Sequence, residues 1–113
     1  MDSTRQQKIS RQLQKDLSEI FIREAAELFR GLMISVTAVR VSPDLSYAKV
    51  YLSIFPFEKH EQAMSVLEQH GRFIRRALGG RIRNQMRIVP ELSFFLDDSL
   101  EYIENIDNLL KED

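Results

Sequence analysis

The chain has 113 residues, of which 43% are hydrophobic, and a formal net charge of −1. This length and composition exclude a disordered chain and predict one globular domain over residues 1–113. The sequence has no cysteine, its N-terminus is too polar for a signal peptide, and no apolar run approaches the roughly 20 residues of a membrane span. These features exclude disulfides and thiolate metal sites, and they predict a soluble, cytoplasmic protein.

The first predicted element is an amphipathic helix that runs from a cap at Ser3 to about Arg30. Its apolar residues recur at steps of three and four positions, which is the helical period: Ile9, Leu13, Leu17, Ile20, Phe21 and Leu28. Gly31 then provides a favourable stop for the helix.

Two segments rich in β-branched residues, about 32–42 and 47–55, predict strands. The buried face of the second strand is expected to hold Ala48, Val50, Leu52 and Ile54. The apolar alternation of the first strand slips at its middle, which indicates a β-bulge near Thr37–Ala38. Because Pro43 and Asp44 between the segments are turn formers, an antiparallel hairpin is predicted.

Two helices follow Pro56, one from about 58 to 70 and one from Gly71 to about Met86. The second helix has an apolar stripe, made of Ile74, Leu78, Ile82 and Met86. Its Gly79–Gly80 pair predicts a kink or a break, because glycine is unfavourable inside a helix.

Val89–Pro90 cannot continue that helix, and a third strand is predicted at 91–97. Asp98 and Glu101 then form a capping box for an acidic C-terminal helix, at about 98–113. The apolar residues of this helix are expected to face inward: Leu100, Ile103, Ile106 and Leu110.

The predicted order is α–β–β–α–α–β–α, an α+β fold in which helices cover a three-stranded sheet. A hairpin, two consecutive helices and a returning strand make the core order of a type II KH domain. KH domains bind single-stranded RNA and clamp its backbone with a G-x-x-G loop between the two helices.

Six arginines lie between Gln69 and Pro90, where the sequence has no Asp or Glu: Arg72, Arg75, Arg76, Arg81, Arg83 and Arg87. At roughly 100° per residue, four of them form a stripe beside the apolar one, namely Arg72, Arg76, Arg83 and Arg87. Arginine makes bidentate contacts with phosphate and stacks on bases, so this stripe predicts RNA binding. The alternative is a solvated helix face with local ion pairs, although no acid within the segment could form them.

Further basic residues are weaker candidates for RNA contacts: Arg5, Lys8, Arg11 and Lys15 on the first helix, and Lys49 on the hairpin. Residues 97–113 instead hold seven acids against Lys111, and we expect this end to face away from a polyanion. No phosphate loop, catalytic triad or metal-ligand constellation is present, so we expect neither an enzyme nor a cofactor or metal site.

Two segments resemble the bacterial ribosome-binding factor A family. "RVSPDLSYAKVYLS", residues 40–53, is similar to the family's hairpin, and "RIVPELSFFLDDSLE", residues 87–101, to its Val-Pro-Glu-Leu segment. The resemblance covers nearly the whole chain in the right order. In this family a kinked helix–helix junction, marked Ala-x-Gly, replaces the G-x-x-G loop. The matching residues are Gln69-His70-Gly71, which keep the glycine and lack the alanine, so His70 and Gly71 join the candidate RNA contacts.

The resemblance implies a non-catalytic maturation factor for the small (30S) ribosomal subunit, with a link to growth in the cold. Such a factor binds the immature subunit and its 16S rRNA, assists late maturation and rRNA processing, and then dissociates. Two alternatives remain: a protein-interaction module whose arginine face binds an acidic partner, and a general KH-type binder of single-stranded RNA. In each case we expect a monomer that binds neither a membrane nor a small-molecule substrate.

Overall fold

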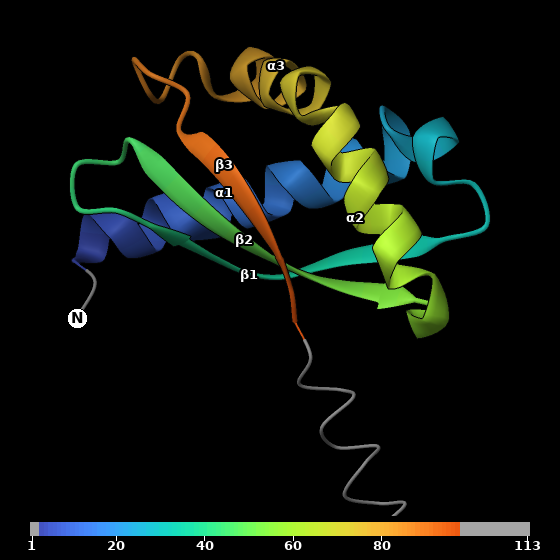
Figure 1. Ribbon diagram of the computed structural model, residues 1–113. Coiled ribbons are helices and arrows are strands. Elements are labelled where there is room, and N and C mark those ends of the chain that lie inside the picture. Colours follow the sequence, from blue (N-terminus) through green and yellow to red (C-terminus); the bar gives the residue numbers. More distant parts are fainter. Residues whose placement is uncertain (1–2, 98–113) are drawn as a thin grey trace, which may run out of the picture.

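The computed structural model describes residues 3–97 (Figure 1). Its helices and strands are α1 (Thr4–Arg23), β1 (Met33–Val41), β2 (Tyr47–Phe55), α2 (His60–Gln69), α3 (Gly71–Ile82) and β3 (Glu91–Leu96). Two short 3₁₀ helices, η1 (Ala26–Phe29) and η2 (Phe57–Lys59), precede β1 and α2. The predicted order is confirmed as far as β3, and the predicted helix at 98–113 lies outside the described residues.

The three strands form one sheet in the order β1-β2-β3. β1 pairs antiparallel with β2 as the predicted hairpin, and β3 returns through α2 and α3 to pair parallel with β2. This is the arrangement predicted for a type II KH-like fold. The fully buried residues of α1 and α3 form one core with the inward side chains of the sheet, so these helices cover the same face (Figure 1).

The predicted β-bulge is confirmed at Thr37. Val36 pairs with Leu52 and Ala38 pairs with Tyr51, so Thr37 has no partner residue on β2. The Gln14 side-chain amide donates to the carbonyl oxygens of Val36 and Thr37 at 3.2 and 3.4 Å. The bulge thus frees backbone acceptors that tie α1 to β1.

The first helix ends at Arg23, so its predicted end near Arg30 is wrong. Ala25 is fully buried, and η1 folds back after it so that Phe29 packs edge-on against Phe21, with ring centroids 5.8 Å apart. In a continuous helix, eight residues would separate the two rings by about 12 Å along the axis. Gly31 has a φ of 79° and, as predicted, ends this helical region in the left-handed conformation.

The predicted break at Gly79–Gly80 is wrong, because α3 continues through both glycines and ends at Ile82 rather than near Met86. After Ile82 the chain reverses toward β3, and Val89 packs on the helix. A Cβ atom added to Gly79 would lie 3.0 Å from Cγ2 of Val89. Gly79 therefore allows a close approach between helix and returning chain, which helical periodicity could not reveal.

Gly80 has no such neighbour, since a Cβ atom added there would meet no atom within 4 Å. We expect Gly80→Ala to raise the free energy of unfolding by about 0.5–1 kcal/mol, because alanine loses less conformational entropy in a helix. Gly79→Ala should gain less or lose stability through its contact with Val89. Denaturant unfolding of both variants checks this, and equal gains at the two sites would contradict it.

The hairpin turn is held by the carboxylate of Asp44. The Ser42 and Ser46 hydroxyls donate to its Oδ1 at 2.7 and 2.8 Å, and the Ser46 backbone N–H donates at 3.1 Å. These hydrogen bonds, that from the Ser42 side chain foremost, lower the pKa of Asp44 from 3.8 to about 2.

A pKa that is lower in the folded than in the unfolded state stabilises the protein where the carboxyl is ionised in both. We expect the contribution of Asp44 to be complete above pH 3.8 and to be lost as the pH falls through about 2. The stability difference between wild type and Asp44→Asn, measured by denaturant unfolding across this range, should therefore shrink with falling pH. A difference independent of pH would contradict this role.

Candidate nucleic-acid interface

An open groove runs along β3, at the edge of the sheet that faces the helix–helix junction. Its first hollow, about 730 Å³, lies between α2 and β3, and its second, about 560 Å³, lies between α3 and the start of β3. Both hollows are lined by Gly71, Leu92 and Phe94. Leu92 and Phe94 are half-buried and pack against the core, so the groove has an apolar floor.

The kinked junction in place of a G-x-x-G loop is present, and its bend lies at His70. This residue has φ −113° and ψ 21°, outside the helical region, and is the only residue between α2 and α3. Gly71 begins α3, and a Cβ atom added there would meet no atom within 4 Å. The two predicted junction candidates therefore have different positions: His70 shapes the bend, and Gly71 leaves the groove open beside it.

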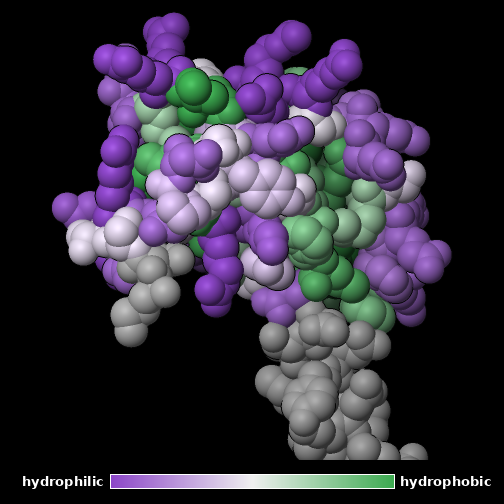
Figure 2. Space-filling model, turned by 60° about the vertical axis from the view of Figure 1, so that its left-hand side comes forward, coloured by the Kyte–Doolittle hydropathy of each residue, from purple (hydrophilic) through white to green (hydrophobic). Residues whose placement is uncertain are grey.

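α3 and its C-cap residue, Arg83, present three arginines of the predicted stripe to solvent. Arg72, Arg76 and Arg83 are exposed, and within residues 3–97 their side chains have no hydrogen-bond or ion-pair partner. The first turn of α3 contains no acidic residue, and no side chain from the described residues caps its N-terminus. Figure 2 shows the hydrophilic side chains crowding the top of the molecule, where α3 and the segment after it lie. Arg72 lies in the first turn of the helix, so the N-terminal end of α3 attracts anions through both its dipole and this arginine.

Arg87 lies after α3, in the irregular segment before β3, and not on the helix where the stripe had placed it. It is exposed and lines a third hollow, of about 350 Å³, together with Arg5 of α1 and Ile88. Ile88 and Ser46 line the second hollow as well. The fold thus brings Arg5 and Arg87, which are distant in sequence, to the end of the same groove.

Arg75 has partners inside the protein. Its Nη2 donates to the carbonyl oxygen of Val89 at 2.8 Å, and its Nε donates to that of Pro90 at 3.2 Å. These carbonyls belong to the segment that leads into β3. Arg75 therefore holds the returning chain against α3 and contributes less to a binding surface than the stripe does.

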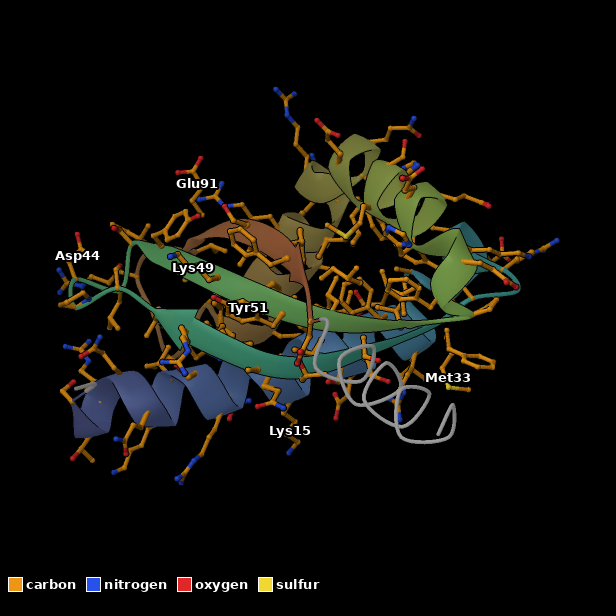
Figure 3. All side chains as sticks on the ribbon, turned by 60° about the horizontal axis from the view of Figure 1, so that its bottom comes forward. Lys15, Met33, Asp44, Lys49, Tyr51 and Glu91 are labelled. Atoms are coloured by element: carbon orange, nitrogen blue, oxygen red, sulfur yellow. The ribbon has the colours of Figure 1, made fainter. Side chains whose placement is uncertain are left out.

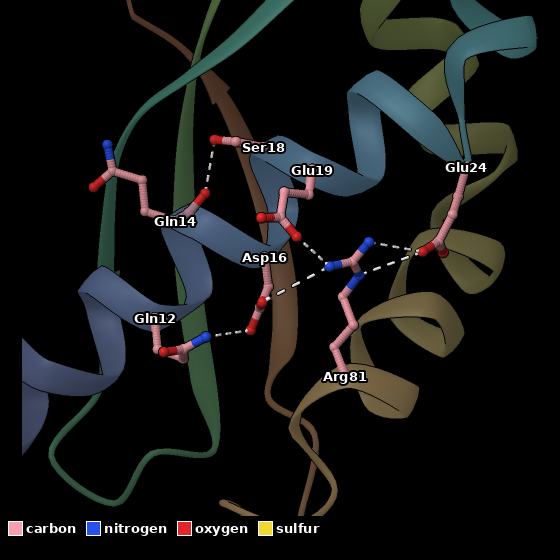
Figure 4. A network of polar contacts seen from close by, with 7 residues as sticks. All are labelled: Gln12, Gln14, Asp16, Ser18, Glu19, Glu24 and Arg81. Atoms are coloured by element: carbon pink, nitrogen blue, oxygen red, sulfur yellow. Dashed lines mark hydrogen bonds and ion pairs between the residues drawn. The ribbon is translucent and has the colours of Figure 1, made fainter.

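Arg81 also has partners, which come from α1 and from its C-cap residue, Glu24 (Figure 4). Its guanidinium donates to Glu19 at 2.5 Å and to Glu24 at 3.0 Å, and it lies 4.0 Å from the carboxylate of Asp16. The hydrogen bonds to Glu19 and Glu24 raise the pKa of Arg81. Asp16 is buried with 6% exposure, and it accepts a further hydrogen bond from Gln12 at 3.0 Å.

The charge pattern of the arginine segment could not reveal this cluster, because its acids lie some 60 residues upstream. One signal was available in the sequence. Asp16 lies on the buried stripe of α1, between Leu13 and Leu17, and a carboxylate on such a face requires a charged or hydrogen-bonding partner. Which arginine supplies that partner depends on the packing of α1 against α3.

The other predicted contacts lie away from the groove. Lys8, Arg11 and Lys15 are exposed on α1, and Lys49 is exposed on β2. Arg11 lines a separate hollow beside the bulge with Arg40. Among residues 3–97, no group of three or more His, Asp or Glu side chains could hold a metal ion. In the same range, no helix has the length and apolar character needed to cross a bilayer.

Known proteins match the chain over nearly its whole length. A sequence profile described as Ribosome-binding factor A matches residues 5–110. A protein of that name from Cytophaga hutchinsonii is 44% identical over 112 residues, 99% of this chain and 84% of its own. The crystal structure of ribosome-binding factor A from Thermus thermophilus is 34% identical and covers 80% of this chain and 94% of its own, with a TM-score of 0.64. Coordinates of the T. thermophilus factor, fitted into a cryo-EM map of a 30S complex, are 33% identical and cover 79% of this chain and 91% of their own, with a TM-score of 0.59.

Substitutions at Arg81 and Arg76 test which arginines of the segment stabilise the fold. We expect Arg81→Gln to lower the free energy of unfolding by about 1–2 kcal/mol, because it removes three charged hydrogen bonds to two carboxylates and leaves Asp16 buried without a cation. Arg76→Gln, which removes no internal partner, should change stability by less than about 0.5 kcal/mol. Denaturant unfolding compares the two variants. A loss from Arg81→Gln as small as the one expected from Arg76→Gln would show that the Arg81 cluster is not stabilising.

Proposed function

The chain belongs to the ribosome-binding factor A family, and on that premise we propose that it binds the 30S ribosomal subunit during assembly through contacts with 16S rRNA. The observation that carries the proposal is a set of unpaired arginines along α3 and at its C-terminal end, of which Arg72 lines an open groove with an apolar floor. Nucleic-acid backbones are bound through cations, and unstacked bases are bound on apolar or aromatic surfaces. Both kinds of surface adjoin here.

Arg72, Arg76 and Arg83 are the proposed primary phosphate contacts. Their guanidinium groups carry no intramolecular partner in the described part of the chain, so they bind phosphate without first breaking an ion pair. Arg5 and Arg87 extend the basic rim past Ile88. Lys8, Arg11 and Lys15 provide a second, weaker basic surface on α1. Arg75 and Arg81 contribute indirectly, because their internal partners hold α3 in position.

The groove is the proposed place for unpaired nucleotides. Leu92 and Phe94 form its floor, and Gly71 lets an RNA backbone approach the start of α3 closely. His70 at the bend lies within reach of the same nucleotides. No step of this mechanism requires bond cleavage: the protein holds an rRNA conformation during late maturation and processing, and it dissociates when the mature subunit no longer offers that conformation. We therefore propose a non-catalytic, monomeric, cytoplasmic assembly factor that needs no cofactor.

A sedimentation experiment tests the proposal. We expect the wild-type protein to migrate in a sucrose gradient of cell lysate with 30S subunits or their precursors. Replacing Arg72, Arg76 and Arg83 with Gln should move it to the top of the gradient, because the primary phosphate contacts are lost. The matched control replaces Arg23, Arg30 and Lys59, which are exposed on other elements, so that the net charge changes equally.

Three results of that gradient would contradict the proposal. Wild-type protein at the top of a gradient that contains precursor subunits would favour a general RNA binder. Association that survives nuclease treatment in a smaller complex would favour an acidic protein partner. Loss of binding in the control to the same degree would show that net charge matters and the α3 stripe does not.

The salt dependence of binding to purified 30S subunits provides a second prediction. Four phosphate contacts from Arg72, Arg76, Arg83 and Arg87 give a slope of about −3 in log K against log salt, at about −0.7 per contact on single strands. The triple Gln variant should reduce the slope to about −1, while the control keeps it near −3. An unchanged slope in the Gln variant would remove these arginines from the interface.

A further inference from the structure

The sheet has a second face that the described helices do not cover. We call it the open face, and it consists of the side chains that alternate with the buried ones on β1, β2 and β3. Large hydrophobic residues gather on it. Met33 and Phe55 are a cross-strand pair with 66% and 69% exposure, and Tyr51 stacks on Phe95 at a centroid distance of 5.6 Å. Such a grouping of exposed apolar side chains is typical of an interaction surface.

The basic end of the open face carries an unusual pair. Arg40 and Lys49 lie directly opposite each other on β1 and β2, and neither side chain has a partner among the described residues. Like charges in this position repel, so anionic neighbours would stabilise the pair. Glu91 of β3 lies diagonally from Lys49 on this face. Lys49 and Tyr51, labelled in Figure 3, point from this face, and Lys15 of α1 lies near its border.

The described chain ends on the same face. Asp97 follows β3, and its side chain is on the same face of the sheet as that of Phe95. Its carboxylate accepts a hydrogen bond from the Thr37 hydroxyl at 2.6 Å, across β2. Its backbone N–H donates to the carbonyl oxygen of Leu52, also at 2.6 Å. The last described residue therefore directs its side chain to the open face.

Residues 98–113 match this surface in length, pattern and charge. As a helix they would extend about 24 Å, and the nine residues of β2 extend about 30 Å. Apolar residues recur at helical spacing at Leu100, Ile103, Ile106 and Leu110. Six acids against Lys111 provide further anionic neighbours for Arg40 and Lys49.

The groove on the other side of β3 is the competing surface for this segment. Its α2 wall carries Glu61 and Glu68, which would repel a segment with a net charge of about −5. The open face offers Arg40 and Lys49 instead. From these observations we propose that residues 98–113 pack as an amphipathic element on the open face of the sheet, over Met33, Phe55, Tyr51 and Phe95. The acidic segment then covers the exposed aromatic side chains and keeps RNA off this face, which confines RNA to the α3 side.

Two pairs of substitutions in the full-length chain test the packing, with NMR of the Tyr51 and Phe95 rings as the readout. Ile103→Asp with Ile106→Asp places charge on the apolar side of the segment. Asn105→Asp with Asn108→Asp adds the same charge on its polar side. We expect the first pair to shift the ring resonances of Tyr51 and Phe95 and the second pair to leave them in place.

The reciprocal test changes the sheet. Phe55→Ser should raise the amide exchange rates of residues 98–113 by about tenfold or more, because it removes part of the surface that protects them. The control is Ile22→Ser on α1, at a side chain with 70% exposure that lies off the open face, and it should leave these rates unchanged.

The proposal is overturned if the Ile103/Ile106 pair leaves both rings unshifted, or if Phe55→Ser leaves the exchange rates at wild-type values. Ring shifts that depend on protein concentration would also overturn it, because a second copy would then occupy the face. If added single-stranded RNA shifts Tyr51 and Phe95 in the wild-type protein, the face is open to RNA and the segment does not cover it.

Discussion

The structure depends on the burial of one face of a three-stranded sheet under α1 and α3. Leu13, Leu17 and Ile20 of α1 and Ile74, Leu78 and Ile82 of α3 are all at most 1% exposed. Because these stripes face the sheet, the opposite side of α3 faces solvent, and the arginines that alternate with the stripe must do so too. The exposed basic surface is therefore a consequence of where the core lies. The same single-sided burial leaves the edge of β3 and the second face of the sheet available for other elements or partners.

The six arginines of the basic segment perform different tasks, although their sequence context is uniform. Arg72, Arg76 and Arg83 face solvent without partners, Arg75 holds the chain that enters β3, and Arg81 joins α3 to α1. Arg75 and Arg81 keep the three exposed arginines in position, because they set how α3 packs against the rest of the protein. A charge count over the segment therefore overestimates the number of exposed, unpaired arginines. It also misses Arg5, which reaches the groove only because α1 begins beside the segment that contains Arg87.

The junction between α2 and α3 connects this arrangement to the family. A bend at the single residue His70 lets α2 and α3 enclose a groove against β3, and Gly71 lies where its two hollows meet. The residue that matches the family's alanine is Gln69, and the bend is present nevertheless. The groove has an apolar floor and a basic rim, and neither surface would enclose a bound ligand.

The sequence alone determined the order of elements, the inward faces of α1, α3 and β2, the bulge at Thr37 and the family, because periodicity, turn chemistry and motif spacing are local properties of the chain. Tertiary structure decided the rest. Helix ends were displaced where packing required a reversal, at Phe29 against Phe21 and at Val89 against Gly79. The role of Arg81 was decided by acids of α1 more than 50 residues away. Such contacts depend on how helices pack, and no local pattern encodes them.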